Sequence, residues 1–469
     1  MVFSSNLFLF FFLPLFLLVY FASPVAARNA VILVASLLFY AFGSGILVWI
    51  LVGSILLNQA AARALTVCDL WLRKPIFIAA VVVNLLPLLY YKYFAFSAQT
   101  LAAAGIALPI DPAMLAGIAL PIGISFFTFQ AISYVVDVYR RTVPPARSML
   151  EFGTYHALFP QLVAGPIVRY VEIRREIAAR RFDLSGMADG ACRFCVGLGK
   201  KVILADNLAP VVDQIFALPV GEQTASLCWL AMLCFSLQIY LDFSGYSDMA
   251  IGLGRMLGFT FPENFDQPYR ARSVTEFWRR WHMTLTRWFR DYVYIPLGGN
   301  RHGEPRTYAN LCIIFVLCGL WHGASLTFLV WGLYHGLLLT AERILRGARG
   351  LVPTGILSLL ATNLLVLLGW VPFRATSLAE AATFLMTMSG LGQGEAIYYP
   401  LAYFLTAERV TYIALGLAVA FVPQERLAPV RLAPSWAHLG RMAGAGALFA
   451  LSVIMLSANS FRPFIYFQF

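Results

Sequence analysis

The stretch from Thr307 to Thr340 restricts the fold most, because its 34 residues include no Asp, Glu, Lys or Arg. An uncharged apolar run of this length is typical of a chain that crosses a lipid bilayer. At its centre lies His322, within the sequence Gly-Leu-Trp-His-Gly-Ala. An ionisable side chain inside a membrane segment is costly and usually faces an interior cavity. Because histidine also exchanges protons near neutral pH, His322 is a candidate functional residue.

The composition of the whole chain also indicates a polytopic membrane protein. Of its 469 residues, 60% are hydrophobic and only 12% are charged, which excludes an ordinary soluble domain. Apolar segments follow one another from about residue 7 to residue 458. Since one crossing needs about 20 residues, we predict an all-α polytopic membrane protein with about 11 transmembrane helices plus re-entrant and interfacial helices. No linker or internal repeat divides the sequence, so residues 1–469 are predicted to form a single transmembrane domain.

The net charge of +11 is first of all an orientation signal, because Lys and Arg gather in cytoplasmic loops. The loop Ala98–Pro112 contains neither residue, whereas the loop Arg169–Arg181 is rich in arginine. We therefore expect Arg169–Arg181 in the cytoplasm and the N-terminus on the periplasmic side, with Leu7–Ala22 retained as a first helix. A basic cytoplasmic face would also attract an anionic ligand. Nucleic acid is not an expected partner.

The same rule bears on the surroundings of His322. The flanking segments 270–306 and 343–349 are both basic, so both are expected in the cytoplasm. Thirty-four helical residues span ~51 Å, which is too long for one crossing and too short for two. A broken or re-entrant hairpin with its bend near Gly319 and Gly323 fits this length and holds His322 inside the membrane. One long tilted helix with a short interfacial turn is the alternative.

The densest group of aromatic and basic side chains follows Arg270. Ser273 and Glu276 form a capping box, which predicts that a helix starts there. An apolar stripe continues at spacings of 3, 4, 3 and 4, through Trp278, Trp281, Leu285, Trp288 and Tyr292. A basic helix with such a stripe is expected to lie in the membrane interface.

Two interpretations of the arginines on this predicted helix remain open. Arg279, Arg280 and Arg287 either bind anionic lipid head groups or also border the mouth of a site for a phosphate-bearing substrate. His282 lies on the same predicted helix, one turn from Trp278. Beside His322 it becomes a candidate second polar group of the site.

A polar cluster at residues 242–248 interrupts another apolar run. Asp242, Ser244, Tyr246 and Asp248 would be expensive if they faced lipid. They are therefore expected to line a pocket, to satisfy a kinked helix or to take part in catalysis. Cys192 and Cys195 have the spacing of a redox or metal pair, but no second pair or nearby histidine supports it, so no metal site is predicted.

Four sequence strings together resemble the membrane-bound O-acyltransferase family, and within it the bacterial branch concerned with alginate O-acetylation. They are Asp-Phe-Ser-Gly-Tyr-Ser-Asp at 242–248, Phe-Trp-Arg-Arg-Trp-His-Met-Thr-Leu at 277–285, Tyr-Ile-Pro-Leu-Gly-Gly-Asn-Arg at 294–301 and Gly-Leu-Trp-His-Gly-Ala at 319–324. The resemblance implies a many-helix bundle around a central tunnel. It also implies that His322 is the intramembrane catalytic histidine and that His282 is the second motif histidine.

The resemblance further implies an O-acyltransferase of the bacterial inner membrane. An acetyl group would move from a cytoplasmic thioester, acetyl-CoA, toward a periplasmic hydroxyl, with periplasmic acetyltransferases as partner proteins and no bound cofactor. The expected catalytic residues are His322 and His282. The expected substrate-binding or tunnel-lining residues are Asp242, Ser244, Tyr246, Asp248, Trp281, Trp321, Arg279 and Arg280. A transporter or lipid flippase, or a non-catalytic scaffold for periplasmic acetyltransferases, is the alternative function.

Overall fold

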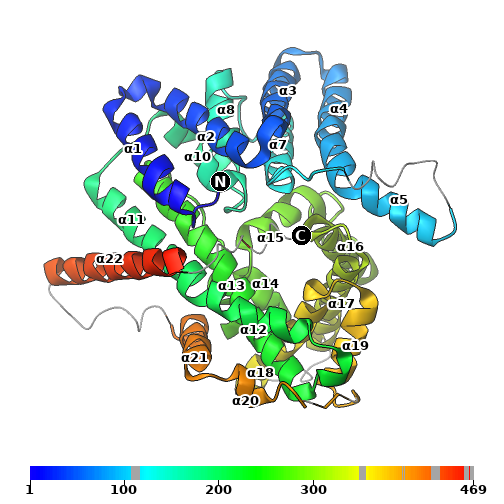
Figure 1. Cartoon of the computed structure of the whole chain (residues 1–469). Coiled ribbons are helices and arrows are strands. Elements are labelled where there is room, and N and C mark those ends of the chain that lie inside the picture. The colour runs from blue at the N-terminus through cyan, green and yellow to red at the C-terminus, as the bar shows by residue number, and fades with distance from the viewer. Residues whose placement is uncertain are drawn as a thin grey trace. The chain divides into compact units, whose positions relative to one another are not determined.

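The computed structural model describes residues 1–106, 117–347, 355–392, 394–395, 397–423, 434–458 and 464. Within these residues every regular element is a helix (Figure 1), so the predicted all-α class is confirmed. The chain divides into two compact units. The first contains Met1–Phe194 and Met249–Pro262, and the second contains Cys195–Asp248 and Glu263–Phe469. The single domain over residues 1–469 stays a prediction.

Five helical stretches in the described chain are long and apolar enough to cross a membrane, which shows a multi-span membrane protein. They are Val25–Val67, Leu70–Ala103, Ala225–Met256, Gly355–Arg374 and His438–Ala458. Three shorter apolar helical stretches accompany them, Phe8–Ala22, Ile124–Tyr139 and Leu378–Met388. The count of about 11 crossings, the central tunnel and the side of the N-terminus stay predictions.

The first unit is built from the N-terminal helices. These are α1 (Leu13–Ala22), α2 (Arg28–Ser44), α3 (Val48–Val67), α4 (Leu70–Leu88), α5 (Phe94–Ala103), α7 (Ile124–Tyr139), α8 (Met149–Ala157), α9 (Phe159–Leu162), α10 (Tyr170–Ala178) and most of α11 (Leu184–Gly199). Helices α3, α4 and α7 pack together, and every residue of α7 before Tyr139 is buried. Polar side chains inside this unit bond to one another, as in the pair Asn58 and Asn84.

The second unit contains the two histidines of the predicted site. Its helices are α12 (Asp206–Phe216), most of α13 (Ala225–Met256), α14 (Val274–Arg280), α15 (Met283–Phe289), α16 (Glu304–His322), α17 (Leu326–Gly347), α18 (Gly355–Arg374), α19 (Leu378–Met388), α20 (Leu401–Phe404), α21 (Ala407–Phe421) and α22 (Pro434–Ala458). Helices α16, α17 and α18 pack in succession.

The segment around His322 is a helical hairpin, as predicted. Helix α16 ends at His322, the backbone is extended at Gly323, and α17 begins at Leu326. The two helices lie side by side (Figure 1) at backbone contact, because a Cβ on Gly319 would overlap the carbonyl oxygen of Phe328. The alternative of one long tilted helix is wrong.

The predicted limits of the hairpin, however, were too narrow. Helices α16 and α17 have 19 and 22 residues, or ~28 and ~33 Å, because each extends into the charged sequence that flanks the apolar stretch. Arg343 of α17 bonds Glu304 of α16 at 2.7 and 2.8 Å. The charged ends of the two helices therefore bond to each other. Each helix is longer than half of the uncharged stretch.

The predicted amphipathic helix starts where the capping box places it, since the Ser273 hydroxyl accepts from the Glu276 backbone at 3.0 Å. It is nevertheless two helices. Helix α14 ends at Arg280, and His282 adopts a left-handed conformation with φ of 42°, which costs ~1–2 kcal/mol for an L-residue. The single continuous helix was therefore a wrong prediction, and its position in the membrane interface stays a prediction.

Four of the five residues of the apolar stripe are buried inside the protein, and Tyr292 is half-buried. Trp278, Trp281, Leu285 and Trp288 are each 5% exposed or less. Spacing did not reveal the break, because both short helices bury the same kinds of side chain as one continuous helix would. The segment is therefore part of the core of the second unit.

Candidate active site

His322 lies in a cage of aromatic rings formed by three helices. The side chain is 4% exposed. Its ring makes edge contacts with Trp321, Trp331 and Phe373, at centroid distances of 4.9, 5.0 and 5.3 Å. Trp331 belongs to α17 and Phe373 to α18. The end of α16 therefore places an imidazole in apolar surroundings where electrostatic interactions are strong.

His282 lies at the break between α14 and α15 and is fully buried. Its ring packs on Phe243 of α13 at 4.7 Å and on Trp321 at 5.7 Å. Trp321 also touches His322. The structure thus brings the two predicted catalytic histidines to the same indole.

A residue that sequence analysis missed, Asn264, anchors His282. Its side-chain oxygen Oδ1 lies 3.0 Å from Nδ1 of His282 and accepts from the Thr284 hydroxyl at 2.8 Å and the Thr284 backbone at 3.3 Å. Its amide nitrogen donates to the Ser247 hydroxyl at 3.1 Å, and its backbone oxygen accepts from Met283 at 2.9 Å. One buried residue therefore supports both the ring and the first turn of α15.

A weak signal for Asn264 exists in the sequence. It stands in Pro-Glu-Asn-Phe-Asp-Gln-Pro at 262–268, where two prolines predict an irregular segment. Asn side chains in such segments often bond to backbone groups. The sequence does not say which backbone, because Thr284 lies 20 residues further on.

His335 is a third buried histidine near the cage. It is fully buried on α17, and its ring contacts Trp278 and Trp331 at centroid distances of 5.1 Å each. Neither ring nitrogen has a hydrogen-bond partner among the described residues. Gly369 leaves the space for this ring, because a Cβ there would come within 2.8 Å of Nε2. His335 is therefore held by ring packing rather than by hydrogen bonds within the described part of the chain.

The two carboxylates of the 242–248 cluster bind lysines of the segment that follows α11. Lys201 lies 2.9 Å from Asp242 and 2.6 Å from Asp206, and Lys200 lies 2.7 Å from Asp248. Lys201 and Asp242 are almost completely buried. The ion pairs hold α13 against residues 200–206. They favour a structural role for the two aspartates, whose role in the reaction stays a prediction.

Gly245 lets these two segments approach each other. A Cβ at this position would lie 2.7 Å from the carbonyl oxygen of Gly197 and 3.2 Å from the backbone nitrogen of Lys201. The other predicted residues of the cluster are buried too. The Ser244 hydroxyl has no hydrogen-bond partner in the described part of the chain, and Tyr246 packs on Phe464 at 4.8 Å.

Trp281 fills the aromatic core behind the two histidines. It is 1% exposed, and its ring lies 5.0 Å from that of Trp370 and 5.1 Å from that of Phe265. It has no ring contact with His322 or His282 among the described residues. A direct role of Trp281 in binding a substrate stays a prediction.

A cavity of about 550 Å³ opens between α14, α15, α16 and α17. Its walls are mostly apolar, with positive charge from Arg279, Arg290 and Arg343 and one negative charge from Glu342. Cys318, one helical turn before His322, contributes to the wall. The wall also includes Trp278, whose buried indole nitrogen has no hydrogen-bond partner among the described residues. Such a space suits an amphiphilic ligand with an anionic end.

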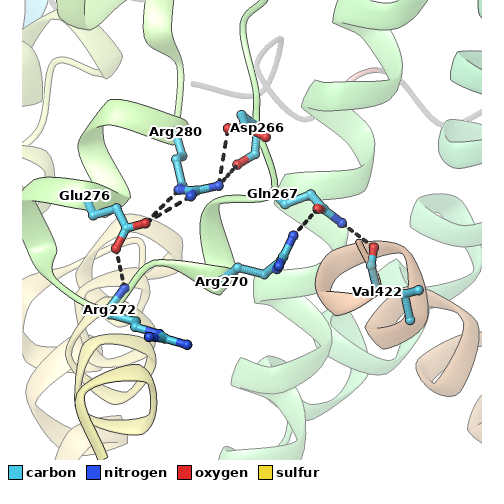
Figure 2. Close-up of polar contacts among 7 residues, drawn as sticks. All are labelled: Asp266, Gln267, Arg270, Arg272, Glu276, Arg280 and Val422. Atoms are coloured by element: carbon cyan, nitrogen blue, oxygen red, sulfur yellow. Dashed lines mark hydrogen bonds and ion pairs between the residues drawn. The ribbon is translucent and has the colours of Figure 1, made fainter. Parts of the chain in front are cut away.

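The two arginines that were predicted together have different surroundings. Arg279 is exposed and lines the cavity. Arg280 instead bonds Glu276 at 3.0 Å and Asp266 at 3.2 Å, as Figure 2 shows. In the same view Gln267 joins Arg270 to the backbone of Val422. Arg279 is therefore accessible to a ligand, whereas Arg280 holds the segment before α14.

Charges beside the cavity are partly compensated by one another. The two hydrogen bonds from Arg343 lower the pKa of the Glu304 carboxyl to about 2. Arg290 bonds Asp291 at 2.7 Å. Arg279 has no hydrogen bond or ion pair with any residue that the structure describes, which leaves its charge available to an anion. No group of three or more His, Cys, Asp or Glu residues suited to a metal ion occurs in the described residues.

Comparisons with known proteins identify the family of the chain. The model of the membrane-bound O-acyltransferase family (MBOAT) matches residues 140–378, which include both histidines, Asn264 and the cavity. The chain is 40% identical to "Probable alginate O-acetylase AlgI" of Pseudomonas putida and 41% identical to the protein of that name from Azotobacter vinelandii, over 100% of each chain. It is 35% identical to "Peptidoglycan O-acetyltransferase" of Helicobacter pylori, over 83% of this chain and 80% of that protein. The chain therefore belongs to the membrane-bound O-acyltransferase family.

Proposed function

We propose that this O-acyltransferase moves an acetyl or other short acyl group from a cytoplasmic thioester toward a periplasmic hydroxyl, for O-acetylation of an alginate-like exopolysaccharide. The observation that carries the proposal is the position of His322, which is buried at the tip of a helical hairpin beside Trp321 and close to the wall of a basic cavity. A buried histidine of this kind suits proton transfer.

In the proposed reaction, His322 is the general base. It takes the proton of the acceptor hydroxyl while the hydroxyl oxygen attacks the thioester carbonyl carbon. The new C–O bond gives a tetrahedral oxyanion, which collapses as the C–S bond breaks. The leaving thiolate recovers the proton from the imidazolium, so atoms and charge balance. Base catalysis of this type typically contributes ~10²–10⁴-fold in rate.

The cavity between α14 and α17 is the proposed donor site. Arg279 would bind a phosphate group of acetyl-CoA, because guanidinium groups suit phosphate geometry. The apolar walls would hold the less polar part of the donor, and its acyl end would point toward Cys318, one turn from His322. The donor is a substrate, so the proposal requires no resident cofactor.

The acceptor side of the proposal rests on the relatives. Two of them carry the name of an alginate O-acetylase and a third is named for peptidoglycan, which are both polymers with hydroxyl groups. We propose that the acetyl group leaves this chain toward the periplasm, where partner acetyltransferases deliver it to the polymer. The bacterial inner membrane, with a periplasmic N-terminus, is the proposed location.

Labelled acetyl-CoA supplied to the purified protein in vesicles tests this function. The wild type should consume the donor and transfer the label to a hydroxyl acceptor, and His322→Ala should lose this activity while still inserting in the membrane. His302→Ala is the matched control, because His302 is an exposed loop histidine. Full activity of His322→Ala would contradict the general-base role, and movement of cargo without consumption of donor would favour a transporter.

A further inference from the structure

The orientation of the Asn264 side chain can be assigned from its neighbours. The backbone N–H of Thr284 points to Oδ1 at 3.3 Å, and a backbone N–H can only donate. If the amide oxygen and nitrogen were exchanged, two donors would face each other at a fully buried site. The atom that faces Thr284 is therefore the oxygen.

This assignment decides where the proton of His282 lies. The same Oδ1 atom is 3.0 Å from Nδ1 of His282, and an amide oxygen can only accept, so Nδ1 carries the proton. In a neutral imidazole the other nitrogen, Nε2, then presents a lone pair. Nε2 of His282 is buried and has no hydrogen-bond partner among the described residues.

We propose that Asn264 is a positioning residue that locks His282 in the Nδ1–H tautomer, and that Nε2 accepts a hydrogen bond from an O–H or N–H group of the bound substrate. This inference rests on the proposed acyl transfer. As a neutral acceptor, His282 cannot donate to the tetrahedral oxyanion. It orients the substrate, while His322 takes the proton of the reacting hydroxyl.

The groups around the His282 ring show what else could fix its proton. The described contacts of the His282 ring are aromatic and come from Phe243, Phe265 and Trp321. The titratable groups on the adjoining turns of α13 are Asp242, which is bonded to Lys201, and Tyr246, which packs on Phe464. On α16 the adjoining titratable group is His322, on the other side of Trp321. Asn264 is therefore the one polar side chain of the described residues that directly bonds this ring.

The decisive measurement is the tautomer itself. Protein labelled with ¹⁵N-histidine is reconstituted in lipid nanodiscs, and the His282 signal is assigned by its loss in His282→Gln. The wild type should show Nδ1 protonated and Nε2 unprotonated at neutral pH. A wild-type spectrum with a protonated Nε2 and a bare Nδ1 would overturn the proposal, with no variant needed.

The variant Asn264→Asp then tests whether residue 264 controls the ring. A carboxylate keeps the acceptor oxygen and the support of α15, but it stabilises the imidazolium. The charged form of His282 should persist to higher pH, and the acidic limb of the kcat profile should move up by at least about one pH unit. The KM for acetyl-CoA should change little, because the cavity lies on other residues. An unchanged spectrum and an unchanged acidic limb would contradict the proposal.

Ser247→Ala is the matched control. It removes the acceptor of the Asn264 amide nitrogen but leaves Oδ1 facing His282, so the tautomer should be that of the wild type. The two proposals fail separately. The expected tautomer without any acyl transfer would remove the proposed function and the substrate contact of Nε2, but not the control of the tautomer by Asn264. Acyl transfer with the opposite tautomer would remove the positioning role alone.

Discussion

Arg343 of α17 donates two hydrogen bonds, of 2.7 and 2.8 Å, to the carboxylate of Glu304 of α16. The pair joins one end of the hairpin whose other end carries His322. The same arginine lines the cavity that we propose for the acyl donor. The fold of the hairpin and the wall of the proposed donor site therefore share one side chain.

This pair gives a pH dependence with a defined sign. The pKa of Glu304 in the folded protein is lowered from 4.5 to about 2, so its contribution to stability is complete above about pH 4.5 and disappears as the pH falls toward 2. Glu304→Gln should therefore lower the apparent Tm of the purified protein at pH 6, and the difference from the wild type should vanish near pH 2. A difference that grows toward acid would contradict the assignment.

The close contact of α16 and α17 predicts that Gly319 cannot be enlarged. A Cβ at Gly319 would overlap the backbone oxygen of Phe328, so Gly319→Ala must separate the helices and should cost ~1–3 kcal/mol. Gly53→Ala is the matched control, because nothing lies within 4 Å of a Cβ there and alanine favours a helix. Thermal unfolding in detergent should show a lower Tm for Gly319→Ala only. Equal stability of the two variants would contradict the packing of the hairpin.

Variants of the buried ion pair of Lys201 and Asp242 test whether Asp242 has a structural or a catalytic role. Lys201→Met removes the cation that bonds the buried Asp242 and the half-buried Asp206, and should cost ~3–5 kcal/mol. The double variant Lys201→Met with Asp242→Asn removes part of that charge imbalance and should recover stability and activity together. Stability and acyl transfer are measured on the wild type and on both variants. Recovery of stability without activity would instead show that Asp242 takes part in the reaction.

Arg279 and Arg280 form a natural pair for testing the donor site. Arg279→Ala should raise the KM for acetyl-CoA severalfold with little change in kcat, and more strongly at low salt, because a guanidinium that faces solvent is screened by ions. Arg280→Ala should leave the KM near the wild-type value. It should lower stability by ~0.2–1 kcal/mol, the range of exposed ion pairs. The opposite pattern would show that the donor does not bind in this cavity.

Much of the fold follows from local sequence. The uncharged stretch between Thr307 and Thr340, with basic residues on both sides, predicted a hairpin around His322. Ser273 and Glu276 predicted the start of a helix, and the structure places it there. These predictions succeeded because charge, glycine and capping residues act on neighbours within a few turns of the chain.

The sequence alone therefore determined the helical class, the family and the two histidines as candidates. The tertiary structure decided how they are held. The break at His282 depends on backbone and side-chain bonds from Asn264, and the charges of Asp242 and Asp248 are met by lysines far earlier in the chain. A periodic pattern describes which side of a helix is apolar. It does not encode which distant group will supply the hydrogen bond that a buried polar atom requires.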